Sequence, residues 1–516
     1  MPTAWLYIAV FVAGLTTLGV EMTASRLLGN VFGTSNLVWA NIIGLMLAYL
    51  TLGYFLGGRW ADRSPRPATF YGVITWAALT SGLVPLAARP VLRHAASAVE
   101  SLDAAVMAGS FLAVLILFSV PITLLGCVSP FAIRLAISDT ARAGRVSGRI
   151  YAISTLGSIL GTFLPVLVLI PTIGTARTFL AFSGSLMLVG LIGLALVSRR
   201  RALLLLWMPL VLAGLSLWSL AGSIKNTEGQ IFEGESAYNY VQVIERQGMR
   251  LLLLNEGQGI HSVYTPDGGA TFGTWDYFLA APFFNAPPHP VESIERLGLV
   301  GLAAGTVARQ YTDVFGPLPI DGWEIDPLIV EVGRRYFDMR QPNLHVFVED
   351  GRWGLAHSPH SYSVIGVDAY RLPYIPWHLT TREFFLEVRA RLLDDGVLVI
   401  NVGRTPDDRR LIEAMAGTIG SVFPSVHVVD VPYTFNSILY ASVQPSTPEN
   451  LRANLGLLAA QGAPDLLLDS LARALAYLQP TPESAIVFTD DWAPIEQLTN
   501  SMALRFMFSG DLEMLR

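Results

Sequence analysis

The chain has 516 residues, of which 52% are hydrophobic and 14% are charged, and its mean hydropathy is +0.48. A typical soluble protein carries about 25% charged residues, so this composition argues against a wholly soluble chain. It also excludes intrinsic disorder, which requires low hydrophobicity and high net charge. The single cysteine, Cys127, excludes a disulfide framework and any zinc or iron–sulfur site built from several cysteines.

The charges divide the chain into two unlike parts. Residues 1–222 hold 14 arginines, no lysine and 5 acidic residues, a balance of +9, and the remainder holds 20 basic and 35 acidic residues, a balance of −15. The first part is therefore basic and apolar, whereas the second has the composition of an ordinary acidic domain. An acidic domain argues against nucleic acid as its main partner.

Seven apolar stretches in the first part have the roughly 20 residues that a helix needs to cross a lipid bilayer. The fourth is over-long and contains Pro121 and Pro130, so it is predicted to be one kinked helix or two short pieces with a re-entrant turn. Small residues are spaced for close helix packing, namely Gly14, Gly19, Gly44, Gly157 and Gly161. The predicted spans are Ala4–Leu27, Leu37–Gly57, Ala68–Ala88, Ala104–Ile133, Ala152–Ile170, Ala176–Val197 and Ala202–Ala221.

Arginine placement predicts how these helices are oriented. Arginines follow the second, fourth and sixth spans, and the positive-inside rule places those loops and the N-terminus in the cytoplasm. Seven crossings would then export the second part of the chain, whereas the chemistry inferred below uses a cytosolic metabolite. We expect a multi-pass cell-membrane protein with a cytosolic soluble domain, which requires that the fourth segment crosses twice or that the seventh does not cross. The loop arginines are Arg59, Arg63, Arg66, Arg134, Arg142, Arg145, Arg149, Arg199, Arg200 and Arg201.

Two residues of the first part have unusual chemistry for a membrane segment. Glu21 lies inside the first span, and a carboxylate in hydrocarbon is costly, so Glu21 is a candidate functional residue. The alternative is a buried pair or a protonated side chain that fixes helix packing. Cys127 is expected to be a small apolar packing residue.

After Lys225, strands and helices alternate, which predicts a parallel sheet with crossover helices. A small antiparallel set of strands and a helix over Trp275–Phe284 precede this sheet, and a helical appendage over Pro448–Leu478 follows it. The fold class is thus a multi-pass helical membrane domain followed by an α/β Rossmann-like domain of the class I methyltransferase type. The predicted strands are Tyr238–Val243, Leu251–Asn255, His261–Tyr264, Leu297–Val300, a strand ending in Trp323–Asp326, Leu344–Val348, Tyr362–Val367, Gly396–Val402, Val426–Val431 and Ser437–Val443.

Polar residues at three strand ends favour a nucleotide-like ligand, since ligands of open α/β sheets bind at the carboxyl ends of the strands. The turn with Gly301 and Gly305 permits close approach of a ligand to backbone N–H groups, although it lacks the full three-glycine fingerprint. Glu324 lies about 20 residues further on, where an acid accepts the ribose hydroxyls. Asp350 ends the third strand and could bind an adenine amino group. The alternative is that Glu324 and Asp350 only cap the helices that follow.

Asp368 is the candidate reacting group. It ends the fourth strand, where a carboxylate could accept a proton from an attacking amine. The alternative is that Asp368 caps the loop that follows it.

The order and spacing of five motifs resemble those of the spermidine and spermine synthases, the polyamine aminopropyltransferases. The resemblance covers about residues 232–443, and the whole chain resembles the membrane-fused bacterial branch of the family, including the late segment TDDWAPIE (Thr489–Glu496). It implies transfer of a 3-aminopropyl group from decarboxylated S-adenosylmethionine to an amine such as putrescine, with release of methylthioadenosine. The motifs are ESAYNYVQV (Glu235–Val243), the glycine turn, WEIDP (Trp323–Pro327), VEDGR (Val348–Arg352) and GVDAY (Gly366–Tyr370).

The resemblance also implies roles for individual residues. Asn239 is expected near the sulfur end of the donor, Glu324 at the ribose, and Asp350 with Gly351 at the adenine. Asp368 matches the catalytic carboxylate of the family, and Tyr370 is expected on the substrate side. No prosthetic group or metal is implied. The expected partners are the adenosyl donor, the amine and the lipid bilayer, without nucleic acid, and a homodimer is expected because the family forms dimers.

This sequence departs from the family where the amine groups are bound. Ala304 replaces an aspartate of the glycine turn, Arg371 replaces an aspartate three residues after the catalytic one, and Trp275 replaces a histidine. Acidic residues elsewhere are therefore the candidate replacement anchors for the amine. They are Asp276, Asp490, Asp491 and Glu496.

Two other functions remain open. One is a methyltransferase that uses intact S-adenosylmethionine, which the loss of the aspartate at Ala304 would fit. The other is a non-catalytic adenosyl sensor coupled to the membrane domain. The expected organisation is a polytopic domain over residues 1–222, a linker with a small β subdomain over 223–285, a catalytic domain over 286–445 and a C-terminal appendage over 446–516.

Overall fold

The structure is a computed structural model of the chain, and it describes residues 3–32, 36–99, 103–137, 139–219, 227–255, 259–370 and 374–509. It contains two compact units. The helical unit comprises Met1–Thr227 with Glu235–Tyr240, and the soluble unit comprises Glu228–Gly234 with Val241–Arg516.

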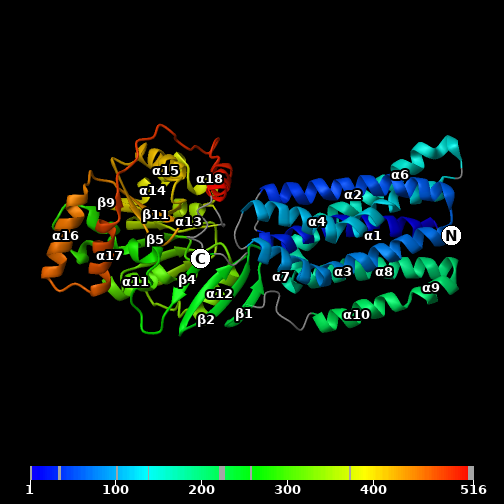
Figure 1. The fold of residues 1–516 in the computed structure, drawn as a ribbon, viewed down its shortest axis with the longest axis horizontal. Helices are drawn as coiled ribbons and strands as arrows, with labels where there is room; N and C mark the ends of the chain where they lie inside the picture. Colours follow the sequence, from blue (N-terminus) through cyan, green and yellow to red (C-terminus); the bar gives the residue numbers. More distant parts are fainter. Residues whose placement is uncertain are drawn as a thin grey trace. The chain divides into compact units, whose positions relative to one another are not determined.

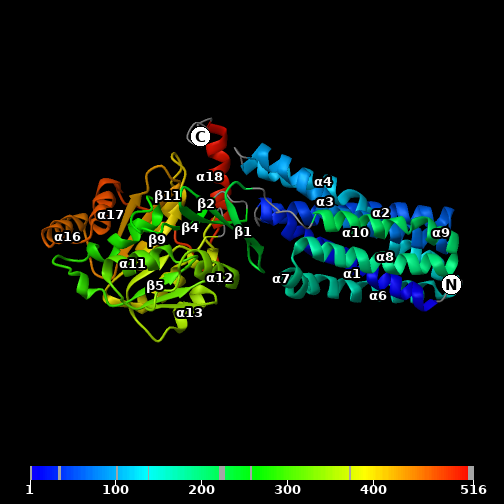
Figure 2. The same ribbon diagram turned by 90° about the horizontal axis from the view of Figure 1, so that it is seen from below.

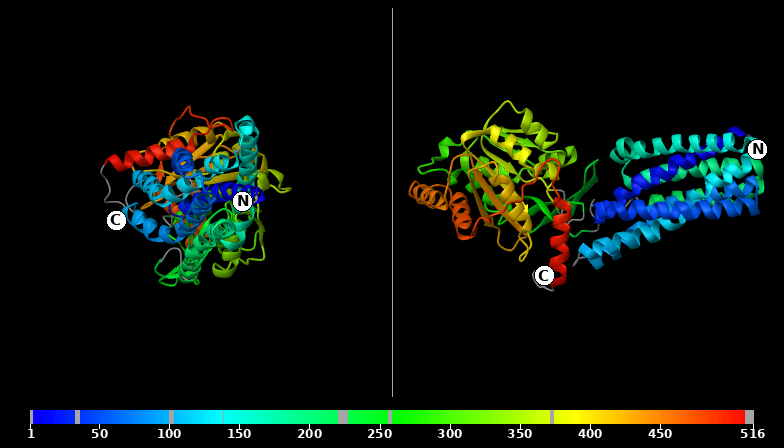
Figure 3. Two further views of the ribbon diagram at one scale, coloured as in Figure 1. Left: turned by 90° about the vertical axis from the view of Figure 1, so that its right-hand side faces the viewer. Right: turned by 90° about the horizontal axis from the view of Figure 1, so that it is seen from above.

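The helical unit is a bundle of long apolar helices that run side by side (Figures 1 and 2), seen end-on and from above in Figure 3. Within the described residues, 7 helical segments are long and apolar enough to cross a membrane, as the sequence predicts. The elements are α1 (Thr3–Phe32), α2 (Asn36–Arg63), α3 (Pro67–Val99), α4 (Asp103–Gly126), α5 (Val128–Ala136), η1 (Thr140–Arg142), α6 (Ala143–Leu164), η2 (Pro165–Leu169), α7 (Ile170–Ile173), α8 (Thr175–Val197), α9 (Arg199–Leu205) and α10 (Trp207–Ser219).

The fourth apolar segment is broken at Cys127 but runs in one direction. The Asn41 side chain donates to Ser110 Oγ (3.0 Å) at one end of α2, and Arg134 pairs with Asp62 (3.1 Å) at the other end. Successive residues of α4 and α5 thus lie beside successive residues of α2, so the pair of helices is a single traverse. Of the two alternatives for this segment, the structure therefore favours one interrupted helix over two pieces that reverse direction.

The seventh apolar segment, which contains α10, lies beside α3. The Trp207 ring lies 6.3 Å from that of Trp76, and a Cβ at Gly82, further along α3, would lie 3.0 Å from Leu212. The α10 helix therefore runs beside α3 in the same direction.

Close packing of α1 against α6 depends on glycine. A Cβ at Gly157 would lie 2.1 Å from the Phe11 carbonyl oxygen, and one at Gly161 would lie 2.2 Å from that of Leu15. Gly14 and Gly19 are equally crowded, as predicted. At Gly44, by contrast, no described residue lies within 4 Å of where a Cβ would be, so the close packing expected there was wrong.

The soluble unit contains two sheets. The first has the strand order β1-β2-β3-β4, and its strand β1 was missed because QIFEGE lacks a long apolar run. The second has the order β12-β10-β11-β9-β8-β5-β6-β7, with β5, β6, β7, β8 and β9 parallel and β10 and β11 antiparallel at one side. The strands are β1 (Gln230–Glu235), β2 (Tyr240–Arg246), β3 (Met249–Leu254), β4 (Ile260–Tyr264), β5 (Leu297–Val300), β6 (Ile320–Trp323), β7 (Leu344–Phe347), β8 (Tyr362–Val367), β9 (Leu392–Gly403), β10 (Ser425–Asp430), β11 (Asn436–Ser442) and β12 (Leu478–Gln479).

Helices cover both faces of the second sheet, which confirms the Rossmann-like prediction (Figure 1). One face packs on η3, α11, α16 and α17, and the other on α13, α14, α15 and α18. The predicted helix before β5 is a run of 3-10 turns, η3, whose residues are all buried. These elements are η3 (Thr274–Phe284), η4 (Val291–Ser293), α11 (Thr306–Phe315), α12 (Pro327–Tyr336), α13 (Gly351–His357), η5 (Trp377–Leu379), α14 (Arg382–Arg391), α15 (Arg410–Gly420), α16 (Pro448–Ala460), α17 (Asp465–Ala476) and α18 (Ile495–Ser509).

Candidate active site

The ends of four neighbouring parallel strands form the candidate site. Val300 of β5 is in register with Trp323 of β6 and Val367 of β8, and Trp323 is in register with Phe347 of β7. The residues that follow these strand ends are therefore brought to one edge of the sheet. They are Gly301, Glu324, Asp350 and Asp368.

The glycine turn after β5 lies against the end of β8. Gly301 has φ +88°, and a Cβ there would lie 2.7 Å from the Asp368 carbonyl oxygen. Gly305 has φ +86° and begins α11 in the left-handed conformation that favours glycine. Both glycines are thus required by backbone geometry at the point where a ligand would approach.

Strand β4 supports this turn from the first sheet. The Ala304 N–H donates to Ser262 Oγ (2.9 Å), and Thr306 exchanges two hydrogen bonds of 3.0 Å with the Val263 backbone. Neither Ser262 nor Thr306 was predicted as a site residue, since these pairings join segments more than 40 residues apart.

Glu324 accepts hydrogen bonds from the backbone of the turn. One carboxylate oxygen accepts from the Ala303 N–H (2.9 Å), and the other accepts from the Asp326 N–H (3.0 Å). Burial raises the pKa of Glu324 to about 7. Asp326 is the residue that caps α12, so Glu324 is free of that role. Each carboxylate oxygen can accept a further hydrogen bond, as a ribose would require.

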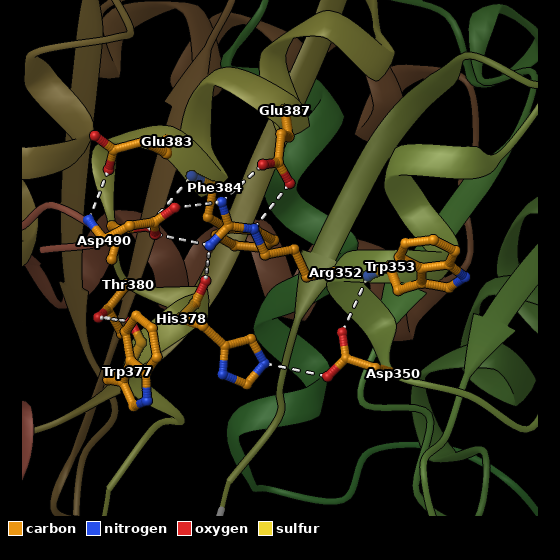
Figure 4. A network of polar contacts seen from close by, with 11 residues as sticks. Asp350, Arg352, Trp353, Trp377, His378, Thr380, Glu383, Phe384, Glu387 and Asp490 are labelled. Carbon is orange, nitrogen blue, oxygen red and sulfur yellow. Dashed lines mark hydrogen bonds and ion pairs between the residues drawn. The ribbon is translucent and has the colours of Figure 1, made fainter.

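Asp350 caps α13 and also contacts a histidine. One oxygen accepts from the Trp353 N–H (3.0 Å), and the other lies 3.2 Å from His378 Nε2 (Figure 4). The His378 contact holds the pKa of Asp350 below its usual value. Asp350 therefore does cap α13, as the alternative predicts, but the capping hydrogen bond uses only one of its two carboxylate oxygens. Gly351 packs against β5, where a Cβ would lie 2.7 Å from Val300 Cγ1.

Asp368 is held by two uncharged donors. Asn401 Nδ2 donates to Asp368 Oδ1 (2.9 Å), and the Trp275 side chain donates a second hydrogen bond. Burial raises the pKa of Asp368 to about 6, and both hydrogen bonds oppose this rise because they favour the ionised form. The carboxylate is therefore mostly ionised at neutral pH but close enough to its pKa to accept a proton.

Asn401 was not predicted, although it is a polar residue in a strand that ends at the same edge. It is 6% exposed, and its Oδ1 is buried without a hydrogen-bond partner in the part of the chain that the structure describes. The Tyr370 hydroxyl donates to the Asn401 carbonyl oxygen (3.1 Å), which places Tyr370 next to the reacting group. A donor on a ligand could therefore reach this oxygen only if the residues around it moved.

The candidate amine anchors lie in different surroundings. Asp276 is fully buried and accepts from Thr271, Phe272 and Gln310 and pairs with Arg473 (3.1 Å), so its carboxylate is already occupied. Asp490 is occupied by Arg352. Asp491 is exposed and Glu496 lies in the first turn of α18.

Two further positions named in the sequence analysis stay untested. Arg371 lies outside the described residues. Asn239 falls in the segment that groups with the helical unit, where the Ser236 hydroxyl accepts from its N–H (2.9 Å), so its donor contact stays a prediction. Within the part of the chain that the structure describes, no group of three or more His, Cys, Asp or Glu side chains could hold a metal ion.

Known proteins resemble about half of this chain. A probable polyamine aminopropyl transferase of Bifidobacterium longum is 34% identical over 283 residues, covering 52% of this chain and 61% of the relative. A polyamine aminopropyltransferase of Vibrio vulnificus is 28% identical over 284 residues, covering 52% of this chain and 91% of the relative. Over this half, the chain is similar to polyamine aminopropyltransferases. It spans about three fifths of the Bifidobacterium relative, and no family profile matches it.

Other similarities are weaker. The mouse eEF1A lysine and N-terminal methyltransferase is 29% identical over 168 residues, covering 30% of this chain and 24% of the relative. A probable spermidine synthase structure from Corynebacterium glutamicum has a TM-score of 0.39 and 21% identity, covering 48% of this chain and 95% of that one. The Thermotoga maritima spermidine synthase structure has a TM-score of 0.36 and 19% identity, covering 47% and 87%.

Proposed function

We propose that the soluble unit transfers a 3-aminopropyl group from decarboxylated S-adenosylmethionine to an amine such as putrescine and releases methylthioadenosine. The observation that carries this proposal is the juxtaposition of Asp368 with the glycine turn, in which Gly301 touches the Asp368 backbone. The similarity to polyamine aminopropyltransferases over half of the chain supports the same reaction. A homodimer is part of the proposal by analogy with the family.

The donor would lie along the carboxyl edge of the sheet. Glu324 would accept the ribose hydroxyls, and Asp350 with the Gly351 backbone would bind the adenine. Gly301 and Gly305 allow the donor to approach the backbone, and Asn239 is proposed to lie near the sulfur. This order places the sulfonium end of the donor next to Asp368.

The chemistry is an in-line displacement at carbon. The amine nitrogen forms a bond to the carbon attached to the sulfonium, the carbon–sulfur bond breaks, and its electron pair stays on sulfur as a neutral thioether. A free alkylammonium has a pKa of about 10.4, so the nitrogen must lose a proton before it attacks. Asp368 would accept a proton from the amine, and the Asn401 Nδ2 hydrogen bond would hold the carboxylate in place for this step.

Fewer residues of the structure indicate how the rest of the acceptor amine would bind than indicate where its attacking nitrogen would lie. Tyr370 is next to Asn401 and is proposed to line the acceptor side. Asp491 and Glu496 are the remaining proposed anchors for a second ammonium group. Asp276 could serve only if its pairing with Arg473 were broken.

A methyltransferase is the second candidate function, because part of the chain is similar to eEF1A methyltransferases. Both reactions displace a thioether from an adenosyl sulfonium, but the leaving groups differ. A donor panel with several amines separates them, since the decarboxylated donor yields methylthioadenosine and the intact donor yields S-adenosylhomocysteine. Release of methylthioadenosine by the purified full chain, lost in Asp368→Asn, is the expected result. Release of S-adenosylhomocysteine alone would reject aminopropyl transfer.

For the helical unit we propose a lipid bilayer as its surroundings and the cytoplasmic N-terminus that the sequence predicts. For the soluble unit we propose the side of the membrane opposite to the cytosolic side expected from the sequence. Ten of the 14 arginines of this part flank the ends of the second, fourth and sixth spans. The single traverse of the fourth segment and the course of α10 beside α3 support seven crossings. The positive-inside rule then favours a cytoplasmic N-terminus and a soluble unit on the other face. Both substrates would have to reach that face, so assays should supply them to detergent-solubilised protein.

A further inference from the structure

Arg352, in the first turn of α13, connects this helix to two distant segments of the soluble unit (Figure 4). Its guanidinium donates to both oxygens of Glu387 (2.9 and 2.7 Å) and to both oxygens of Asp490 (2.8 and 2.9 Å). It also donates to the His378 carbonyl oxygen (2.9 Å). All five N–H donors of the side chain are therefore used, and the side chain is 17% exposed.

The bond to His378 continues to the carboxylate at the nucleobase side of the site. The backbone of His378 is fixed by Arg352, and its imidazole lies 3.2 Å from Asp350 Oδ2. Asp350 and Arg352 are only two residues apart at the start of α13. Arg352 contacts the backbone of His378 and Asp350 contacts its imidazole, as Figure 4 shows. The loop that carries His378 is thus held at its backbone by Arg352 and at its side chain by Asp350.

Asp490 brings the late segment of the chain into this arrangement. Besides Arg352, it accepts a hydrogen bond from Thr381 Oγ1 (2.7 Å), and its own N–H donates to Glu383 (3.0 Å). Nearby, the Arg382 N–H donates to the Phe488 carbonyl oxygen (2.8 Å), and Phe488 is buried. The segment around Asp490 is therefore anchored to the start of α14, directly after the loop of His378.

We propose that Arg352 is a positioning residue for the nucleobase: held by Asp490 and Glu387, it fixes His378 so that His378 orients the Asp350 carboxylate toward the exocyclic amino group of the base. This inference rests on the proposed function and adds to it the late segment as a determinant of base recognition. Asp350 is held in its ionised form by the same histidine, since a hydrogen bond to a carboxylate favours its charge. A charged acceptor favours a ligand that carries the matching donor over one that lacks it, because the second ligand leaves the carboxylate unpaired.

The test compares two ligands that differ only in the group to be recognised. Calorimetry on the purified full chain would measure Kd for methylthioadenosine and for the same nucleoside without its 6-amino group. Wild-type protein is expected to prefer methylthioadenosine by about tenfold or more, because a hydrogen bond to a charged group is at stake. Asp490→Asn and Arg352→Lys are expected to bring this ratio below about threefold. The first removes the charge that holds Arg352, and in the second the three N–H donors of lysine cannot replace the five hydrogen bonds of the planar guanidinium. The Kd of the deaminated nucleoside should stay within about twofold of wild type.

A matched control breaks another arginine–carboxylate contact of the soluble unit. Asp408→Asn removes a 2.7 Å pairing with Arg410 and should leave the ratio unchanged. If Asp490→Asn raised the Kd of both nucleosides by the same factor, the pairing would only support the fold. If neither Kd changed, the pairing would have no role in binding. Either result overturns the inference while the proposed function stands. Failure of the wild-type protein to bind either nucleoside would instead reject the proposed function.

Discussion

The Asn401 side chain donates a 2.9 Å hydrogen bond to Asp368, while its own amide oxygen is buried without a partner among the described residues. Asn401 lies within β9 and Asp368 directly follows β8, and these two strands are adjacent and parallel, so strand pairing rather than a flexible loop sets the distance between the two residues. An unpaired buried acceptor is costly in a folded protein unless a ligand satisfies it. This pair is therefore the most specific indication of where the attacking amine would bind.

Replacing Asn401 tests this relationship. Asn401→Ala removes a donor that favours the ionised carboxylate, so the pKa of Asp368 should rise above its value of about 6. The acidic limb of the kcat/KM profile should then move to higher pH, with a loss of activity that is larger at pH 6.5 than at pH 8.5. A pH–rate profile of both proteins measures this shift. A uniform loss at every pH would contradict the role of Asn401 in setting that pKa.

Asp368→Asn should abolish transfer and leave donor binding intact. The amide keeps the shape of the side chain but cannot accept the proton of the amine, and a general base typically contributes about 10²–10⁴-fold to the rate. Product analysis by mass spectrometry and calorimetry with methylthioadenosine measure the two properties separately. Full activity of the variant would show that Asp368 is not the base.

Glu324→Gln should weaken the binding of methylthioadenosine. Burial raises the pKa of Glu324 to about 7, so the fraction of ionised carboxylate increases between pH 6 and pH 8. Because the ionised form is the stronger acceptor for ribose hydroxyls, wild-type affinity should increase over this range. The pKa of Asp350 is lowered, so Asp350 stays ionised and adds nothing to this slope. Calorimetry across this range should find the slope in wild type and not in Glu324→Gln.

The orientation of the helical unit can be measured with single cysteines in a Cys127→Ala background. Asp465→Cys lies at an exposed position at the start of α17, and Pro65→Cys lies in the exposed loop between α2 and α3. A membrane-impermeant maleimide should label Asp465→Cys in intact cells, after permeabilisation of any outer membrane, and should not label Pro65→Cys. The reverse pattern would place the soluble unit in the cytoplasm.

Gly157→Ala should destabilise the helical bundle. The added Cβ would lie 2.1 Å from the Phe11 carbonyl oxygen, so α1 and α6 would have to separate, at a cost of about 1–3 kcal/mol. Gly44→Ala is the matched control, because the space around Gly44 is open. Thermal unfolding in detergent should show a lower Tm for Gly157→Ala only. An equal Tm for both variants would mean that the two helices do not pack as described.

The sequence alone was sufficient for features that depend on composition and local order along the chain. Seven apolar stretches of bilayer length, the alternation of strands and helices, and the polar residues at strand ends can all be read from neighbouring residues, because helix and strand periodicities are local. Glu324, Asp350 and Asp368 were predicted in this way. The register of the parallel strands places these three residues at one edge of the sheet.

Only the tertiary structure could reveal contacts between residues far apart in the chain. Asn401 and Trp275 contact Asp368 across 33 and 93 positions respectively, and Arg352 contacts Asp490 across 138. The same is true of Asp276, whose carboxylate looked available in the sequence but is occupied by Arg473. No local pattern records such pairings, because they are decided by how helices and strands pack, and packing depends on the whole chain at once.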